Sequence, residues 1–164
     1  MSFILSVNRR SVEDTVSAFA AYQQYIGSVR TRLPPGALQL LDSDWYFENH
    51  PHSPHDSWLE KLEVHEVASG AREQLRRSAI KIKLLSSYHD GIIELNYERV
   101  YRYSFRADYG SVETSAHGDW LWDEFTLNEA NHLVHSIEWQ RGLWEIEADD
   151  VIYTWRNLSP AVSV

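Results

Sequence analysis

Three histidines and an aspartate lie within seven residues, in the stretch HPHSPHD at positions 50–56. They are His50, His52, His55 and Asp56. Imidazole nitrogens and carboxylate oxygens are the ligands that zinc and related divalent metals take in proteins. The stretch therefore offers one functional hypothesis, a metal-dependent or acid–base enzyme that uses this loop. The competing interpretation is a proline-containing surface loop without chemistry.

The histidine spacing is similar to the His-x-His-x-Asp-His signature of the metallo-β-lactamase superfamily, with His50, His52 and His55 on its three histidines. Pro54 stands where that family has its aspartate, and Asp56 comes two places too late. The chain is also short for that fold and lacks its alternation of strands and helices. We therefore do not assign the family, and we expect no cofactor, with zinc or another divalent metal as the alternative.

Nucleophilic and phosphate chemistry find little support in the sequence. There is no cysteine, no Gly-x-Ser-x-Gly elbow and no glycine-rich phosphate loop. We name no catalytic residue and favour a protein that is not an enzyme. A second alternative is a small-ligand pocket lined by the aromatic residues Trp120, Trp122 and Tyr101, although tryptophans at alternate positions more often face a core.

The charge is unevenly distributed along the chain. Residues 1–107 carry 13 acidic and 13 basic residues, whereas residues 108–164 carry 11 acidic residues and only Arg141 and Arg156. The whole net charge of −9 therefore belongs to the last third. This asymmetry argues against nucleic acid or an anionic membrane as the partner of that region and favours a basic protein.

Two apolar-aromatic runs flank Arg141-Gly142 and predict a β-hairpin over residues 132–148. If these two residues form the turn, Trp139 faces Trp144 on one side of the hairpin. The same register places Glu138 opposite Glu145 on the other side.

Like charges that face each other across two strands are destabilising. The acidic row is completed by Glu147, two residues beyond Glu145. We hypothesise that Glu138, Glu145 and Glu147 bind a basic protein partner. The alternative is a solvated face whose repulsion is screened by salt.

The remaining elements predict the fold class. Ser11 is a candidate N-cap of a helix over residues 11–32, and a short strand is expected over residues 3–7. Alternation on both sides of Asp90-Gly91 predicts a hairpin with Lys83 opposite Glu98. A further turn is expected at residues 149–150.

We therefore predict an α+β protein of one domain, residues 1–164, with one long N-terminal helix packed on a twisted antiparallel β-sheet of six to eight strands. Whether the sheet stays open or forms a sandwich or barrel is undecided. The N-terminus lacks the pattern of a signal peptide, and the chain has no cysteine, so a cytoplasmic location is expected. In outline, the chain is similar to bacterial immunity proteins, which are small acidic inhibitors of basic toxin domains.

Overall fold

A computed structural model describes residues 2–6, 11–111, 113 and 115–158. The long helix α1 spans Val12–Val29, and the Ser11 side chain accepts a hydrogen bond from the Asp14 backbone N–H at 3.1 Å. A 3₁₀ turn, η2 (Arg30–Arg32), follows directly, and a short helix, α2 (Pro35–Leu41), begins after Pro34. The predicted helix and its N-cap are thus confirmed. No described helix combines the length and the apolar character that a membrane span requires.

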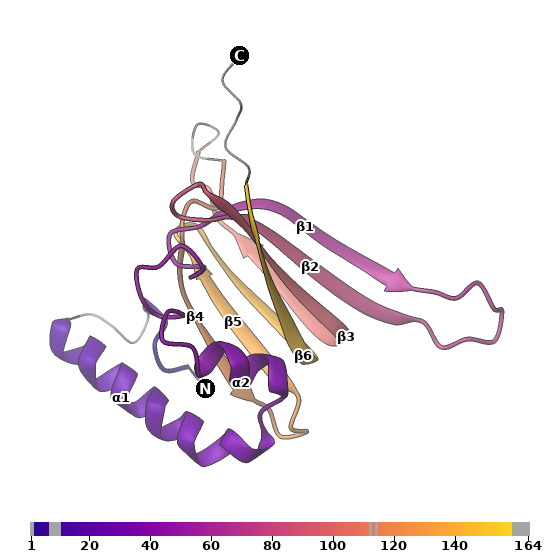
Figure 1. Cartoon of the computed structure of the whole chain (residues 1–164), viewed down its shortest axis with the longest axis horizontal. Coiled ribbons are helices and arrows are strands. Elements are labelled where there is room, and N and C mark those ends of the chain that lie inside the picture. Colours follow the sequence, from indigo (N-terminus) through magenta and orange to yellow (C-terminus); the bar gives the residue numbers. More distant parts are fainter. Residues whose placement is uncertain (1, 7–10, 112, 114, 159–164) are drawn as a thin grey trace.

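In the described part of the chain, six antiparallel strands form one sheet in the order β1-β2-β3-β6-β5-β4. Their bounds are β1 Trp58–Val67, β2 Arg77–Leu85, β3 Gly91–Ala107, β4 Trp120–Leu127, β5 Leu133–Trp139 and β6 Gly142–Asn157. The α+β class is confirmed, with a strand count at the low end of the expected range and a sheet that does not close into a barrel (Figure 1).

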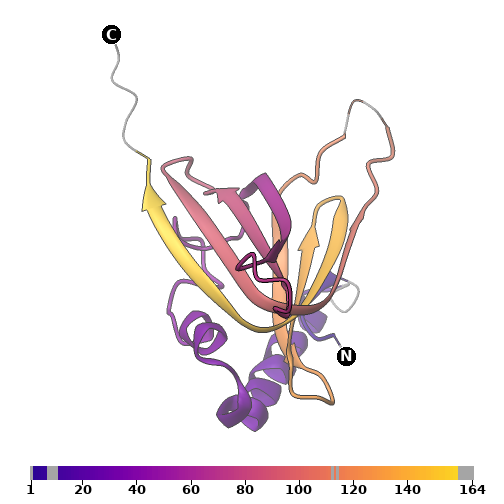
Figure 2. The ribbon, with the colours of Figure 1, turned by 90° about the vertical axis from the view of Figure 1, so that its right-hand side faces the viewer.

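The sheet is sharply bent, and β3 and β6 run through the bend together (Figure 2). Arg99 adopts a left-handed φ of 54°, and the β3–β6 register shifts between Val100 and Arg102. Such bulges bend and twist the strand that carries them. The bend divides the sheet into two halves. The first half-sheet contains β1, β2, the start of β3 and the end of β6. The second contains residues 100–107 of β3, residues 142–148 of β6, β5 and β4.

The predicted turn at Asp149 and Asp150 is wrong, because β6 continues through both residues. Asp150 remains paired with Glu98, and Ala148 with Val100, so the chain bends at this point without reversing.

The core lies between the inner faces of the two half-sheets. Isoleucine and leucine side chains of the first half-sheet, such as Ile82 and Leu95, are fully buried. They belong to one cluster with Trp120, Trp139 and Trp144 of the second half-sheet. The alternation of apolar residues along each strand thus predicted the buried face, since successive side chains point to opposite sides of a sheet.

Two other local predictions are wrong. Residues Phe3 to Leu5 form bends and Ser6 has 3₁₀ conformation, so they are not a strand, and Val7 lies outside the described residues. In the β2–β3 hairpin, Lys83 faces Glu94 instead of Glu98, because Leu85 already pairs with Ile92. The connection is therefore five residues long, from 86 to 90, and not a two-residue turn.

Helix α1 covers the edge of β4. The Tyr22 hydroxyl accepts a hydrogen bond from the Phe125 N–H at 2.7 Å and donates to the Phe125 carbonyl at 3.1 Å. Two residues further along β4, the Leu127 N–H donates to the Tyr25 hydroxyl at 2.7 Å. The helix thus supplies the hydrogen-bonding partners that a neighbouring strand would otherwise provide.

Candidate functional site

The outer face of the second half-sheet is the side turned away from the core. It carries Glu138, Glu145 and Glu147, as the sequence predicted, but in a different register. Glu138 faces Leu143, and Glu145 faces Ser136, so the predicted opposition of Glu138 and Glu145 is wrong. The two acids are diagonal neighbours, which removes most of the expected repulsion.

The register differs because Gly142 lies in β6 and not in the turn. Trp139 pairs with Gly142, so Gln140 and Arg141 form the connection. A Cβ on Gly142 would lie 2.6 Å from the carbonyl oxygen of Arg106 on β3. Glycine is therefore required for close strand packing, and the hairpin shifts by two residues from the one that the sequence indicated.

Arg102 of β3 compensates the two acids of β6. Its guanidinium lies 3.0 Å from a Glu145 carboxylate oxygen and 3.3 Å from a Glu147 oxygen. The other Glu147 oxygen lies 2.7 Å from the His132 ring and 2.7 Å from the Asn128 amide. The hydrogen bond with His132, followed by the one with Asn128, lowers the pKa of the Glu147 carboxyl below its ordinary value, although partial burial opposes the shift.

Glu138 and Glu124 hold the N-terminal segment on the outer face. The Glu138 carboxylate accepts a hydrogen bond from the Ser6 N–H at 2.8 Å. One oxygen of the buried Glu124 accepts from the Phe3 and Ile4 N–H groups at 2.8 and 2.9 Å. Both acids therefore satisfy backbone donors of the same segment, a role that no local sequence signal indicated.

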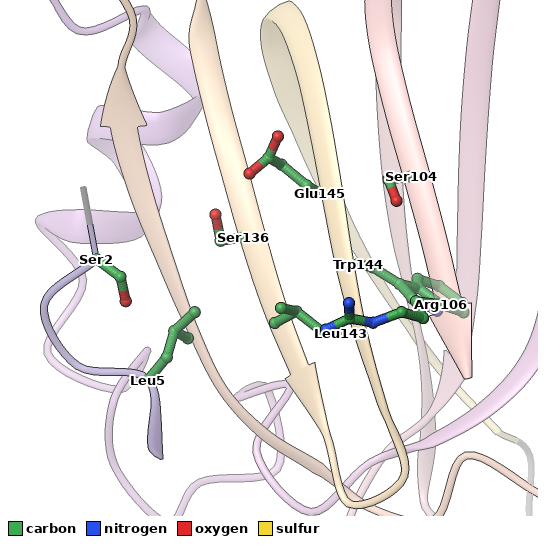
Figure 3. A pocket seen from close by; sticks show the side chains of 8 residues that line it. All are labelled: Ser2, Leu5, Ser104, Arg106, Ser136, Leu143, Trp144 and Glu145. Carbon is green, nitrogen blue, oxygen red and sulfur yellow. The ribbon is translucent and has the colours of Figure 1, made fainter. Parts of the chain in front are cut away.

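A shallow hollow of about 350 Å³ lies on this face beside Glu145 (Figure 3). Serine hydroxyls, one arginine and apolar side chains surround it: Ser2, Leu5, Ser104, Arg106, Ser136, Leu143, Trp144 and Glu145. The Glu145 side chain is 44 % exposed, against 13 % for Glu147. Glu145 is thus more accessible to another molecule than Glu147.

Other acids of the last third also have partners within the fold. Asp150 accepts hydrogen bonds from the Gly36 and Ala37 N–H groups at the start of α2, at 2.9 and 3.1 Å. Asp149 accepts a hydrogen bond from the Tyr101 hydroxyl at 2.5 Å. A carboxylate at a helix N-terminus is stabilising because free N–H groups point toward it. Much of the acidic excess therefore has a structural role.

A buried polar network links three strands, β3, β4 and β5, and the segment before β1. His135 of β5 lies 2.8 Å from Asp123 of β4 through Nε2, and its Nδ1 lies 2.6 Å from the Tyr97 hydroxyl of β3. The same Asp123 oxygen accepts a hydrogen bond from the Tyr46 hydroxyl at 2.6 Å, and Trp120 Nε1 donates to the other oxygen at 3.1 Å.

The network resembles an acid–base pair in its distances, but it is closed to solvent. Asp123 is 4 % exposed and His135 is fully buried. Burial, and then the charge of Asp123, raises the pKa of the Tyr97 and Tyr46 hydroxyls well above the ordinary value, so both remain hydrogen-bond donors. The arrangement satisfies buried polar groups and gives a substrate no access.

The histidine stretch is a connection between α2 and β1, in which the His50 and His52 rings contact each other and Trp45, whereas the His55 ring lies against Trp122. The His50 ring stacks on Trp45 at 6.1 Å, and the His52 ring lies 4.3 Å from that of Trp155. His55 Nδ1 lies 2.5 Å from the Leu121 carbonyl oxygen. Burial, with a contribution from His50, lowers the pKa of His52, which keeps that ring neutral at pH 7.

Asp56 adopts a left-handed φ of 60°, and its N–H donates to the Trp120 carbonyl at 2.8 Å. Across the described residues, no three His, Cys, Asp or Glu side chains gather in a way that would hold a metal ion. The geometry thus lends no support to the alternative of a zinc or other divalent metal site at His50, His52, His55 and Asp56.

The three aromatic residues of the small-ligand hypothesis are not brought together. A bulge between Trp120 and Trp122 turns them to opposite faces of β4. Trp120 is buried in the core, whereas Trp122 packs edge-on against Phe19 at 5.3 Å. Tyr101 lies on β3, two strands away from β5, and stacks on His132 at 3.7 Å.

Comparison with known proteins identifies no relative from which a function could be inferred. No family model matches the chain, and no curated protein matches its sequence.

Proposed function

We propose that the protein is a non-enzymatic binding protein that presents the outer face of its second half-sheet to a basic protein partner. The observation that carries this proposal is the half-exposed Glu145 beside an open, shallow hollow. A hollow of this kind accepts a protruding side chain of a protein, whereas small-molecule sites are deeper and mostly apolar.

Glu145 is the acceptor for an arginine or lysine of the partner. Its present partner, Arg102, is 66 % exposed, and ion pairs between such exposed groups contribute little stability. A guanidinium of the partner therefore replaces or joins Arg102 at a small free-energy cost. Glu138 lies diagonally across the same face, and Glu147 holds Arg102 in place.

A nona-arginine peptide labelled with fluorescein tests the proposal by fluorescence anisotropy at low and moderate salt. Glu145→Lys is expected to weaken binding several-fold, and the difference should shrink as salt is added. The matched control is Glu63→Lys on β1, because Glu63 is also exposed and pairs with one lysine, Lys61, at 2.8 Å. Equal losses in the two variants would show that only net charge matters and would refute a defined site.

A further inference from the structure

Among the described residues, one part of the sheet edge has no covering element. β2 pairs with β3 only as far as Ile80 and Tyr97, after which the β1–β2 hairpin projects past the bend (Figure 1). From Glu98 to Ala107, β3 pairs with β6 on one side, and no described residue pairs with it on the other. Ten consecutive residues thus form an open strand edge.

The other edges are protected, so the open edge of β3 is a distinct feature. α1 covers β4 through Tyr22 and Tyr25. Near the end of β6, the Tyr153 hydroxyl donates to the His52 carbonyl at 2.7 Å, and α2 is bound to Asp150. β1 is bulged and carries a run of charged residues, which blunts an edge.

One hydrogen bond shows which residues of β3 direct their backbone N–H and C=O groups toward the open side. The Asp108 N–H donates to the Arg141 carbonyl at 3.1 Å, toward the β6 side. In an antiparallel strand, the backbone N–H and C=O groups of one residue point toward the neighbouring strand, and those of the next residue point away from it. The backbone groups of Tyr103, Phe105 and Ala107 therefore point toward the open side and are available to another strand.

The side chains along this edge form two rows of different chemistry. The outer row contains Arg102, Ser104 and Arg106, and Arg106 has no ion pair with any described residue. The inner row contains Tyr103, which is 47 % exposed, and Phe105, whose ring stacks on that of Tyr103 at 5.2 Å. An added strand would thus meet arginines on one face and aromatic rings on the other.

The arginines disfavour a second copy of this chain at the same edge. Two-fold antiparallel pairing would place the row of Arg102, Ser104 and Arg106 beside an identical row. That arrangement sets arginines opposite or diagonal to arginines, which is destabilising. A strand with acidic residues in this row is complementary.

A basic hollow marks one end of the open edge. It has a volume of about 480 Å³ and lies where β2 and β3 diverge. Its lining contains three arginines, Arg76, Arg77 and Arg99, of which Arg77 has no ion pair with any described residue. This hollow accepts an acidic residue at the end of an added strand.

We propose that the open edge of β3 binds an extended segment of another protein, in which acidic and apolar residues alternate. The segment adds a strand to the second half-sheet, with its acids over Arg102 and Arg106 and its apolar side chains against Tyr103 and Phe105. Main-chain hydrogen bonds supply affinity in such strand addition, and alternate side chains supply specificity. This site adjoins the proposed contact at Glu145 and shares Ser104 and Arg106 with the hollow there, but its main-chain contacts do not depend on Glu145.

The probe is a fluorescein-labelled (Glu-Val)₄ peptide, with (Lys-Val)₄ as the charge-reversed control, and binding is measured by fluorescence anisotropy. Tyr103→Pro removes an outward N–H without removing a bond to β6, as an edge strand permits. Tyr103→Val removes the same ring but retains the N–H. We expect (Glu-Val)₄ to bind the parent and the valine variant within about threefold of each other, and the proline variant at least about tenfold more weakly.

Amide hydrogen exchange of the unmodified protein gives a second measurement that needs no variant. Added (Glu-Val)₄ should slow exchange at the Tyr103, Phe105 and Ala107 amides. Absence of both binding and protection overturns the proposal, as does equal binding of the two peptides or unchanged binding to Tyr103→Pro. A concentration-dependent dimer that Tyr103→Pro abolishes would assign the edge to a second copy and would also overturn it.

Discussion

Removal of a single oxygen atom from α1 is expected to destabilise the protein strongly. In Tyr22→Phe, the ring remains and only the hydroxyl is lost. That hydroxyl accepts a hydrogen bond from the Phe125 N–H and donates one to the Phe125 carbonyl, and Tyr22 is 2 % exposed. Two backbone groups of the β4 edge then remain in a buried environment without partners.

The expected cost follows from these two groups. A buried polar group without a partner costs about 1–3 kcal/mol, so the variant should lose about 3 kcal/mol of unfolding free energy. For a chain of 164 residues, this corresponds to a decrease in Tm of roughly 6–12 °C. The pKa of the Tyr22 hydroxyl is raised well above its ordinary value, mainly by burial, so the group is a hydrogen-bond donor at neutral pH.

Urea unfolding followed by tryptophan fluorescence measures the change. Tyr88→Phe is the matched control, because the Tyr88 side chain is 54 % exposed and its hydroxyl donates to Asn49 at 3.3 Å. The control should lie within about 0.5 kcal/mol of the parent, as is usual for surface substitutions. If Tyr22→Phe were as mild as the control, α1 would not supply the missing partner of the β4 edge.

Two glycines and one carboxyl give further predictions. In thermal unfolding, Gly36→Ala should destabilise the protein by about 1–3 kcal/mol or more, because its Cβ would lie 1.8 Å from the Val151 carbonyl oxygen. Gly27→Ala should instead stabilise α1 by roughly 0.5–1 kcal/mol in the same assay, because no atom lies within 4 Å of the added Cβ. The pKa of Glu147 is lowered by its hydrogen bond with His132, so its contribution is present above its ordinary pKa of 4.5 and is lost as the pH falls through the lower folded value. Glu147→Gln should therefore flatten the fall in unfolding free energy measured between neutral and acidic pH, and an unchanged slope would contradict that role.

The periodicity of the strands predicted which residues share a face, but it did not predict which residues face one another. Gly91 and Gly142 both resemble turn glycines, yet both lie inside strands. A Cβ on Gly91 would lie 2.1 Å from the Trp155 ring, and one on Gly142 would lie 2.6 Å from the Arg106 carbonyl oxygen. Close packing requires glycine just as a turn does, so each glycine was wrongly assigned to a turn and each predicted hairpin register was wrong. Both registers differ from the prediction by an even number of residues, so each side chain lies on the predicted face of the sheet but opposite a different residue.

The candidate site was predictable only in part for a related reason. The acids of β6 could be assigned to one face of the sheet. Arg102, which forms ion pairs with Glu145 and Glu147, lies 43 positions before Glu145 in the sequence. The Asp123–His135 pair depends on the β4–β5 register, which a bulge shifts. Such pairings are set by strand order and bulges, and a single sequence contains no direct signal for either.

The order of the strands determines which charges a partner can reach. β6 lies between β3 and β5, so its acids Glu145 and Glu147 meet Arg102 from the electrically neutral first two-thirds of the chain. Among the described residues, β3 has no second neighbour beyond Tyr97, so Arg106 on the same strand meets no acid there. A chain with a net charge of −9 therefore offers a basic strand edge beside a partly compensated acidic face. The sign of the total charge does not predict the sign of every surface that binds.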